Sequence, residues 1–297
     1  MSFNDGANIG SGKTSRRGRT GVAVGGGGAL VVIGLFVLSQ FLGVDLTGLV
    51  GGGGIGGDSG SSTSQELDQC QTGADANTHL DCLVKGTAAA LDAYWAEEYP
   101  ALNGGAYSSP AEGVQLFSGS TNTGCGTASS AVGPFYCPAD QNIYLDTAFF
   151  TELRDRFGAS GGQLAQMYVI AHEWGHHIQN LDGVISRAGD GDTGPGSNTI
   201  RVELQADCYA GAWVGSASTV PDSNGTPFLK PVTQEQIKDA LSAASAVGDD
   251  RIQGASGQIR PESWTHGSSE QRQKWFLAGL NGGATSCDTF GVSAGAL

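Results

Sequence analysis

The sequence predicts an α+β, mainly helical domain with a short β-sheet, preceded by one membrane-spanning helix. Three observations predict this class. Two apolar stretches, residues 163–181 and 199–214, carry polar residues four positions apart, the spacing at which helical side chains share a face. A short run with strand character, Asn142–Asp146, comes just before them. An uncharged apolar run at residues 22–44 is long enough to cross a bilayer.

The chain divides into four parts by composition. Residues 1–21 are polar and rich in glycine, and we expect a disordered tail there. Residues 22–44 form the predicted membrane anchor, and residues 45–64 read as a flexible glycine and serine linker. The remainder, residues 65–297, has the size of a single folded domain.

Basic residues precede the uncharged run and predict its orientation. The cluster at residues 16–19 implies, by the positive-inside rule, a cytoplasmic N-terminus and export of everything after Asp45. A cleaved signal peptide is the alternative, since residues 29–38 have the length of its apolar core. No small-residue cleavage site follows in residues 43–47, which favours an uncleaved anchor. We therefore expect a single-pass cell-membrane protein with an extracytoplasmic domain.

The charge of the chain is strongly negative, at −14. The first 57 residues hold four of the 15 bases and two of the 29 acids, so the remainder carries 11 bases and 27 acids, a net charge of −16. Such a surface repels phosphate backbones, and nucleic acid is therefore not an expected partner.

Six cysteines are typical of a protein in an oxidising compartment. In chain order they are Cys70 and Cys82, Cys125 and Cys137, then Cys208 and Cys287. Six cysteines allow 15 pairings, and the sequence alone does not choose among them; pairing of neighbours is the simplest expectation. No Cys-x-x-Cys occurs, which disfavours a thiolate metal site or a redox motif.

Two helices, a loop-rich segment and one strand are expected between residues 80 and 157. Apolar residues at helical spacing predict a helix over residues 80–99, ended by Pro100. Residues 101–140 are rich in glycine, serine and proline and suggest a loop-dominated segment. The strand Asn142–Asp146 follows, and then a helix over residues 149–157. The free edge of this strand could pair with an extended peptide; an ordinary core strand is the alternative.

The helix over residues 163–181 carries His172-Glu173-x-x-His176. His172 and His176 leave the helix on one face, where both imidazoles can reach one zinc ion at about 2.0–2.1 Å. Glu173 points beside that position and can accept a proton from water. The alternative is a helix with two polar-face histidines and a solvated acid. His177 lies about 140° round the helix from His172 and should not share the metal.

The helix over residues 199–214 carries two acids four positions apart, Glu203 and Asp207. The loop before it is long enough for an antiparallel return beneath the first helix. Glu203 would then complete a two-histidine, one-glutamate zinc site, and Asp207 would accept the free N–H of a ligating histidine. Two solvated acids are the alternative, which the packed apolar positions around them disfavour.

Two further helices are expected near the C-terminus, over residues 233–247 and 268–279. Each begins with a capping box. The box pairs are Thr233 with Gln236 and Ser268 with Gln271. His266 lies just before the second box, where it could donate a hydrogen bond to the oxyanion of a reacting carbonyl. A structural capping partner would look the same in the sequence.

With these motifs in place, the chain resembles the neutral zinc metallopeptidases, membrane-anchored bacterial proteins related to gluzincins at the level of motifs. Residues 133–146, 168–180 and 266–272 carry the resemblance, which extends from about residue 70 to 281. It implies a zincin-like domain with a short sheet edge beside the helix of the two histidines. The Glu-x-x-x-Asp pair of gluzincins corresponds to Glu203, as third ligand, and Asp207 behind it.

The expected function is that of an extracytoplasmic zinc metallopeptidase acting on peptides or proteins. His172, His176 and Glu203 would hold the Zn²⁺ ion, Glu173 would act as general base, and His266 would steady the oxyanion. Two alternatives from other classes stand beside it. One is a zinc-stabilised exported binding or scaffold protein without turnover, and the other is an exported structural or adhesion domain whose histidines bind no metal.

Overall fold

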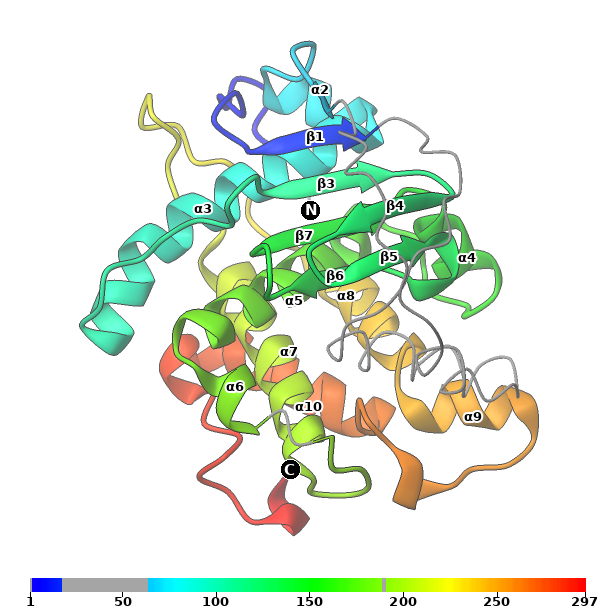
Figure 1. The fold of residues 1–297 in the computed structure, drawn as a ribbon. Helices are drawn as coiled ribbons and strands as arrows, with labels where there is room; N and C mark the ends of the chain where they lie inside the picture. Colours follow the sequence, from blue (N-terminus) through cyan, green and yellow to red (C-terminus); the bar gives the residue numbers. More distant parts are fainter. Residues whose placement is uncertain (1, 18–63, 189–190) are drawn as a thin grey trace.

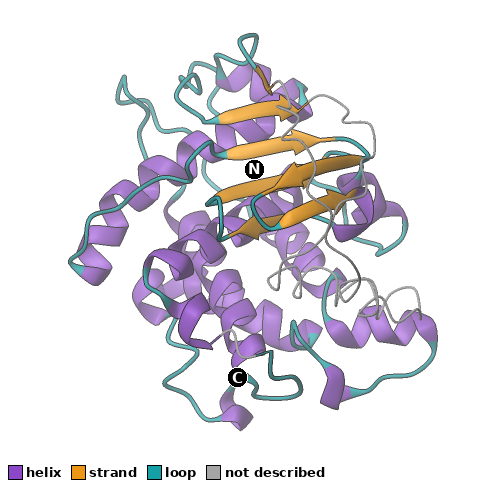
Figure 2. Ribbon diagram, viewed as in Figure 1, coloured by secondary structure: helices purple, strands orange, loops and turns teal. Residues whose placement is uncertain are grey.

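Helices make up most of the fold, with two small sheets beside them, so the class is mixed α+β (Figure 2). The computed structural model describes residues 2–17, 64–188 and 191–297. The predicted anchor at residues 22–44 lies outside this part, as does the predicted linker before Ser64. Among the described residues, no helix is both long enough and apolar enough to cross a bilayer.

The main sheet has five strands in the order β2-β1-β3-β7-β6 (Figure 1). Their bounds are β1 (Thr14–Arg17), β2 (Ser64–Glu66), β3 (Val114–Phe117), β6 (Phe135–Cys137) and β7 (Asn142–Asp146). Strands β1, β3 and β7 run parallel, whereas β2 and β6 pair antiparallel at the two edges. The predicted strand Asn142–Asp146 is confirmed. The expectation that this strand has a free edge is wrong, because β7 lies between β3 and β6, and β6 is the edge strand.

A second, two-stranded sheet occupies the region expected to be mostly loop. It is the hairpin of β4 (Ser120–Thr123) and β5 (Gly126–Ser129), followed by a 3₁₀ turn at Ser130–Val132. Together with β3 and β6, it gives residues 101–140 far more strand than their composition suggests. The disulfide Cys125–Cys137 ties the hairpin to β6.

The N-terminal segment belongs to the folded domain. Phe3, Ala7 and Ile9 are fully buried, and β1 lies inside the main sheet between β2 and β3. The expected disordered tail is therefore wrong for residues 2–17. Composition could not show this, because the partners of these residues lie far along the chain.

Nine α-helices occur in the described part of the chain. They are α2 (Gly73–Thr78), α3 (Leu80–Asn103), α4 (Phe149–Asp155), α5 (Gln163–Leu181), α6 (Val184–Ala188), α7 (Asn198–Ser216), α8 (Gln234–Ala246), α9 (Asp249–Ser256) and α10 (Ser269–Gly282). Short 3₁₀ turns follow at Pro261–Ser263, Ala284–Ser286 and Ala294–Ala296. Helix α3 continues past Pro100 to Asn103 and ends at Gly104, which adopts a left-handed φ of 68°. The capping boxes predicted for α8 and α10 are both present.

Helix α5 lies at the centre of the molecule and contacts α3, α7 and α8. Helix α7 packs on its other side against α10 (Figure 1). The contact between α7 and α10 is unusually close, since a Cβ atom at Gly279 would lie 1.8 Å from the carbonyl oxygen of Cys208. Glycine therefore lets the two helix backbones touch, and the start of α10 is brought over the middle of α7.

All six cysteines are paired, and the pairs are those of the simplest expectation. The bridges are Cys70–Cys82, Cys125–Cys137 and Cys208–Cys287. The last of them anchors the C-terminal segment to α7, the helix that carries Glu203 and Asp207.

Candidate metal centre

Three predicted ligand residues meet between α5 and α7. His172 Nε2 lies 3.2 Å from one carboxylate oxygen of Glu203, and His176 Nε2 lies 3.5 Å from the other. One nitrogen from each histidine and one oxygen of Glu203 fall within 4.8 Å of one another. The His172 and Glu203 side chains are almost completely buried, so the group lies in the protein interior rather than on the surface.

The approach of α5 to α7 depends on a glycine inside the motif. Gly175 faces Ala206, and a Cβ atom at residue 175 would lie 2.9 Å from the Ala206 Cα atom. A larger residue would push the helices apart and move Glu203 away from the histidines. Helix α7 itself starts at a capped turn, where the Ser197 hydroxyl accepts the backbone N–H of Ile200.

Both histidines are held through Nδ1. His172 Nδ1–H donates to Asp207 Oδ1 at 2.8 Å, and His176 Nδ1–H donates to Gln179 Oε1 at 2.8 Å. Since these partners are acceptors, each ring is fixed with Nε2 toward Glu203. Gln179 is held in turn by donating to the Val202 carbonyl at 2.7 Å. Asp207 was predicted; Gln179 was not, although its position three residues after His176 was a usable signal.

The charges around the three ligand residues favour a cation. Burial by itself would raise the pKa of Glu203, but the neighbouring His176 and His172 hold this pKa well below its usual range. Burial likewise opposes ionisation of Asp207, yet Arg272 and His172 lower its pKa to about 2. Burial would lower the pKa of His172, whereas Asp207 and Glu203 raise it to about 10. A metal ion binding to Nε2 would therefore displace a proton from this ring.

The donor set fits zinc. Two imidazole nitrogens and one carboxylate oxygen are the three-ligand set of many catalytic zinc sites, in which a fourth position is left for water or substrate. Every cysteine is in a disulfide, so a structural zinc site of the four-cysteine kind cannot form. Each ligating ring also has the hydrogen-bond partner on Nδ1 that such sites use.

Glu173 lies next to His172 on α5 but outside the group of three ligands. Its side chain is only 8% exposed. Within the described part of the chain, no hydrogen bond or ion pair engages its carboxylate. A carboxylate without a protein partner beside a metal site is available to accept a proton from water.

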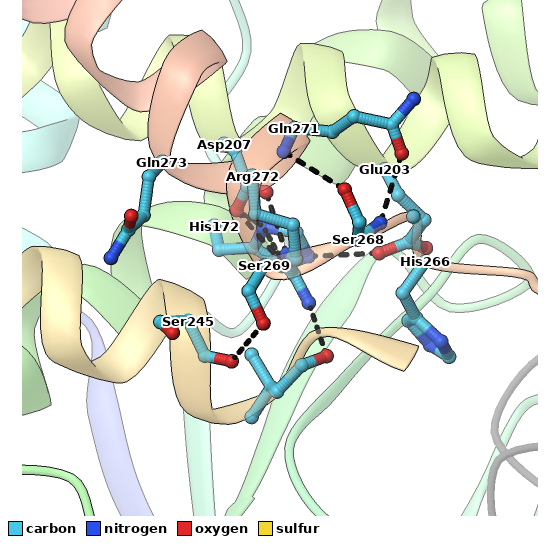
Figure 3. Close-up of polar contacts among 12 residues, drawn as sticks. His172, Glu203, Asp207, Ser245, His266, Ser268, Ser269, Gln271, Arg272 and Gln273 are labelled. Carbon is cyan, nitrogen blue, oxygen red and sulfur yellow. Dashed lines mark hydrogen bonds and ion pairs between the residues drawn. The ribbon is translucent and has the colours of Figure 1, made fainter. Parts of the chain in front are cut away.

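His266 lies near Glu203 (Figure 3) and is held by an acid that the sequence analysis did not identify, Asp249. Its Nδ1 lies 3.1 Å from Asp249 Oδ1. The other oxygen of Asp249 accepts the backbone N–H groups of Thr265, His266 and Gly267 at 2.8, 2.7 and 3.0 Å. Burial would lower the pKa of His266, but Asp249 and the more distant Glu203 raise it. His266 is therefore near Glu203 without belonging to the three-ligand group.

His177 has a structural role in the packing of α5 against the main sheet. It is fully buried, its Nε2–H donates to the Ser108 carbonyl at 2.7 Å, and its Nδ1 accepts from the Tyr136 hydroxyl at 3.1 Å. Because Tyr136 belongs to β6, His177 fixes the edge of the main sheet against α5.

Comparison with known proteins gives a family for the chain. Residues 3–290 match the family model described as "Putative neutral zinc metallopeptidase". The chain belongs to this family. The match includes the N-terminal segment that carries β1 as well as both helices of the candidate centre, so it extends over nearly all of the described residues.

Several bacterial proteins are similar to this member of the neutral zinc metallopeptidase family. Uncharacterised proteins of Mycobacterium tuberculosis and Mycobacterium bovis are 53% identical over 231 residues, 77% of this chain and 76% of theirs. The uncharacterised protein YpfJ of Escherichia coli is 36% identical over 278 residues, 90% of this chain and 88% of its own. No solved structure matches the chain.

Proposed function

We propose that the protein is a zinc-dependent peptidase whose metal is held by His172, His176 and Glu203. The observation that carries the proposal is the convergence of the two Nε2 atoms on one carboxylate. Glu173, next to His172, has no partner among the residues that the structure describes. Membership of a zinc metallopeptidase family supports the same activity.

The mechanism assigns a separate task to each side chain. When bound, zinc supplies Lewis-acid polarisation of a peptide carbonyl and of water. Glu173 accepts a proton from the attacking water and delivers it to the departing amine. Asp207 and Gln179 keep the two ligand histidines in one orientation. His266, fixed through Nδ1 by Asp249, directs Nε2–H to the oxyanion that develops on the carbonyl.

Strand β6 offers a place for the substrate backbone. It is the edge of the main sheet nearest α5, and Tyr136 joins it to that helix by accepting a hydrogen bond from Asn180 at 3.0 Å. An extended peptide added to this edge would run beside the helix that carries His172 and His176. The role first expected for the edge of Asn142–Asp146 is thus proposed for Phe135–Cys137.

The proposed compartment is extracytoplasmic. Three disulfides use every cysteine of the chain, as expected of a protein that folds under oxidising conditions. Membrane association through the uncharged apolar run at residues 22–44 is also part of the proposal. The cytoplasmic N-terminus is not, because β1 lies in the same sheet as β3 and β7.

A zinc-stabilised scaffold without turnover is the second candidate. The ligands come from two different helices, so a bound ion would cross-link α5 to α7 and stabilise the fold whether or not a peptide is cleaved. Such a scaffold would give no reason for an unpaired carboxylate at Glu173, and this favours the peptidase.

The deciding experiment substitutes Glu173→Gln in the purified protein. The variant is expected to bind zinc as the wild type does and to lose peptide hydrolysis by at least about a hundredfold, because the general base is removed. Glu97→Gln, a change at an exposed acid on α3, is the control and should leave both properties unchanged. Zinc content is measured by metal analysis and hydrolysis with a mixed peptide library. Turnover at the wild-type rate by Glu173→Gln would overturn the mechanism, and a zinc-loaded wild type that cleaves nothing would favour the scaffold.

A further inference from the structure

Arg272 is a buried cation directly behind the metal centre. It lies in the first turn of α10 and is 3% exposed. Its Nε donates to Asp207 Oδ2 at 2.7 Å and its Nη2 to Asp207 Oδ1 at 2.9 Å, so the guanidinium grips the carboxylate with two parallel bonds. Nη1 donates to the Val247 carbonyl at 3.1 Å (Figure 3).

The same guanidinium reaches the residues around His172. Arg272 Nη2 donates to the Tyr168 hydroxyl at 3.3 Å and lies 3.4 Å from His172 Nδ1. Tyr168, one helical turn before His172, donates its hydroxyl proton to Asp207 Oδ1. Asp207 therefore accepts from a tyrosine, a histidine and an arginine while fully buried, and Arg272 is the cation that balances its charge.

We propose that Arg272 is a positioning residue for the metal centre. It holds both oxygens of Asp207 in one plane and one orientation, and Asp207 in turn fixes the ring of His172 with Nε2 toward Glu203. This rests on the proposed function, because it concerns how the zinc ligands of that site are presented. A lysine cannot replace the two parallel bonds, since it offers a single point charge.

One short segment of the chain carries both Arg272 and His266, the residue proposed to donate to the oxyanion of the substrate. Ser268 caps α10 by accepting the Gln271 N–H, and Gln271 Oε1 accepts the Ser268 N–H in return. This capped turn makes the segment one stiff unit. Arg272 at one end grips the back of the metal centre, and His266 at the other end lies beside Glu203. Displacement of Arg272 therefore disturbs the ligands and His266 together.

The test compares Arg272→Lys and Arg272→Met with the wild type. Zinc affinity, measured by competition with a chelator, is expected to fall about 10- to 100-fold in both variants. The visible spectrum of the cobalt-loaded protein should change as well, because the orientation of His172 is altered. Arg251→Met, which removes an exposed arginine on α9, is the control for loss of charge.

The outcomes separate this proposal from the proposed function. If Arg272→Met binds zinc with wild-type affinity and its cobalt spectrum is unchanged, the positioning role is overturned, while the proposed peptidase activity is unaffected. A wild-type protein that binds zinc but hydrolyses no peptide would overturn the proposed peptidase activity. The positioning role of Arg272 would still be tested by the zinc affinity and the cobalt spectrum. If Arg272→Met does not fold, Tyr168→Phe removes one donor to Asp207 without a buried charge change, and a shifted cobalt spectrum in that variant supports the network.

A second inference concerns the N-terminal segment and rests on other observations. Strand β1 pairs parallel with β3, with Thr14 opposite Val114, and antiparallel with β2, with Arg17 opposite Ser64. Neighbouring strands lie about 4.8 Å apart, whereas the hydrocarbon core of a bilayer is about 30 Å thick. Residues 2–17 cannot occupy this sheet from across a membrane.

Arg16 and Arg17, the described members of the basic cluster that predicted a cytoplasmic tail, have structural partners. Arg16 Nη2 lies 2.6 Å from Asp81 Oδ1. Arg17 Nε donates to Gln115 Oε1 at 3.0 Å, and the Arg17 guanidinium lies 5.1 Å from the centre of the Tyr144 ring. These charges are thus accounted for by the fold and need no role in orienting an anchor.

We infer that residues 2–17 lie on the same side of the membrane as the metal centre. Arg17 and Ser64 are opposite one another on paired strands, so the two residues that flank the segment 18–63 lie side by side in one sheet. A single crossing between them, with a cytoplasmic N-terminus and an exported domain, is incompatible with this sheet.

The test attaches one epitope tag before residue 1 and another after residue 297 of the full chain. Protease is added to bacterial cells whose outer layers alone are permeable, and both tags are expected to show the same accessibility. Tags on opposite faces of the membrane would overturn the inference.

A charge swap tests the same inference without tags. Arg16→Asp is expected to lower the thermal stability of the domain, and Asp81→Arg in the same chain is expected to restore part of it. A purely topogenic role for Arg16 would not respond to a change at residue 81, so failure of Asp81→Arg to restore stability would count against the structural role of this arginine.

Discussion

At the scale of single residues, the centre is organised by pairs in which a buried acceptor fixes a histidine. Asp207 serves His172, Gln179 serves His176 and Asp249 serves His266. Each acceptor has a further hydrogen-bond partner. Asp207 is bonded to Arg272, Gln179 to the backbone of α7, and Asp249 to three backbone N–H groups. The rings therefore have little rotational freedom, which is the preorganisation a metal-assisted hydrolysis requires.

The Asp249–His266 pair predicts a pH dependence for the metal-free protein. Burial opposes the charge of Asp249, but His266 lowers the pKa of this carboxyl below the ordinary 3.8. The contribution of the ionised carboxylate to the free energy of unfolding is therefore complete above about pH 4 and is lost as the pH falls through the lowered pKa. The pKa of His266 is raised above 6.5 by Asp249 and Glu203, against burial and Arg272. The contribution of His266 to the free energy of unfolding is complete below pH 6.5 and is lost as the pH rises through the raised pKa.

Asp249→Asn should therefore destabilise the metal-free domain most between about pH 4 and 6.5, by roughly 1.5–3 kcal/mol, as for a hydrogen bond to a charged group. The difference from wild type should shrink toward both ends of the range. Thermal unfolding of both proteins from pH 3 to 9 measures it. A difference that does not vary with pH would show that the carboxylate contributes only as a backbone acceptor.

At the scale of elements, the fold depends on close contacts between three helices. The sequence predicted α5, α7 and α10 well, because each has apolar residues at helical spacing and the last has a capping box. Strands β3, β4 and β5 were missed, since they are only four residues long and lie in a segment rich in glycine and serine. Strand β7 was predicted, but the position of a strand within a sheet depends on partners elsewhere in the chain.

Gly279→Ala tests the importance of the contact between α7 and α10. The new Cβ atom would lie 1.8 Å from the Cys208 carbonyl oxygen, so the helices must separate, at a cost of roughly 1–3 kcal/mol. Zinc affinity should fall as well, because Arg272 moves with α10 away from Asp207. Urea unfolding and chelator competition measure the two effects.

Gly254→Ala is the matched control on α9. A Cβ atom there would meet no neighbour closer than 4.0 Å, and alanine is favoured over glycine in a helix. This variant should be as stable as the wild type or slightly more so. Equal stability for Gly279→Ala would mean that the helices tolerate a wider separation than their backbones suggest.

At the scale of the whole molecule, local spacing was predictable and distant pairing was not. His172, His176, Glu203 and Asp207 followed from intervals of four residues within helices. Arg272 is 65 residues from its partner Asp207, and no local pattern indicated it. The N-terminal segment was predicted wrongly for the same reason. Its polar composition suggests disorder, whereas its partners lie far along the chain, such as Asn77, 74 residues from Phe3.

The antiparallel pairing of Arg17 with Ser64 has a practical consequence for making the domain. Two neighbouring antiparallel strands can be joined by a two-residue type I′ turn such as Asn-Gly. A chain in which this turn replaces residues 18–63 would keep every strand of the main sheet and all three disulfides. It would also lack the apolar run at residues 22–44, which makes it a detergent-free starting point for crystallisation with zinc.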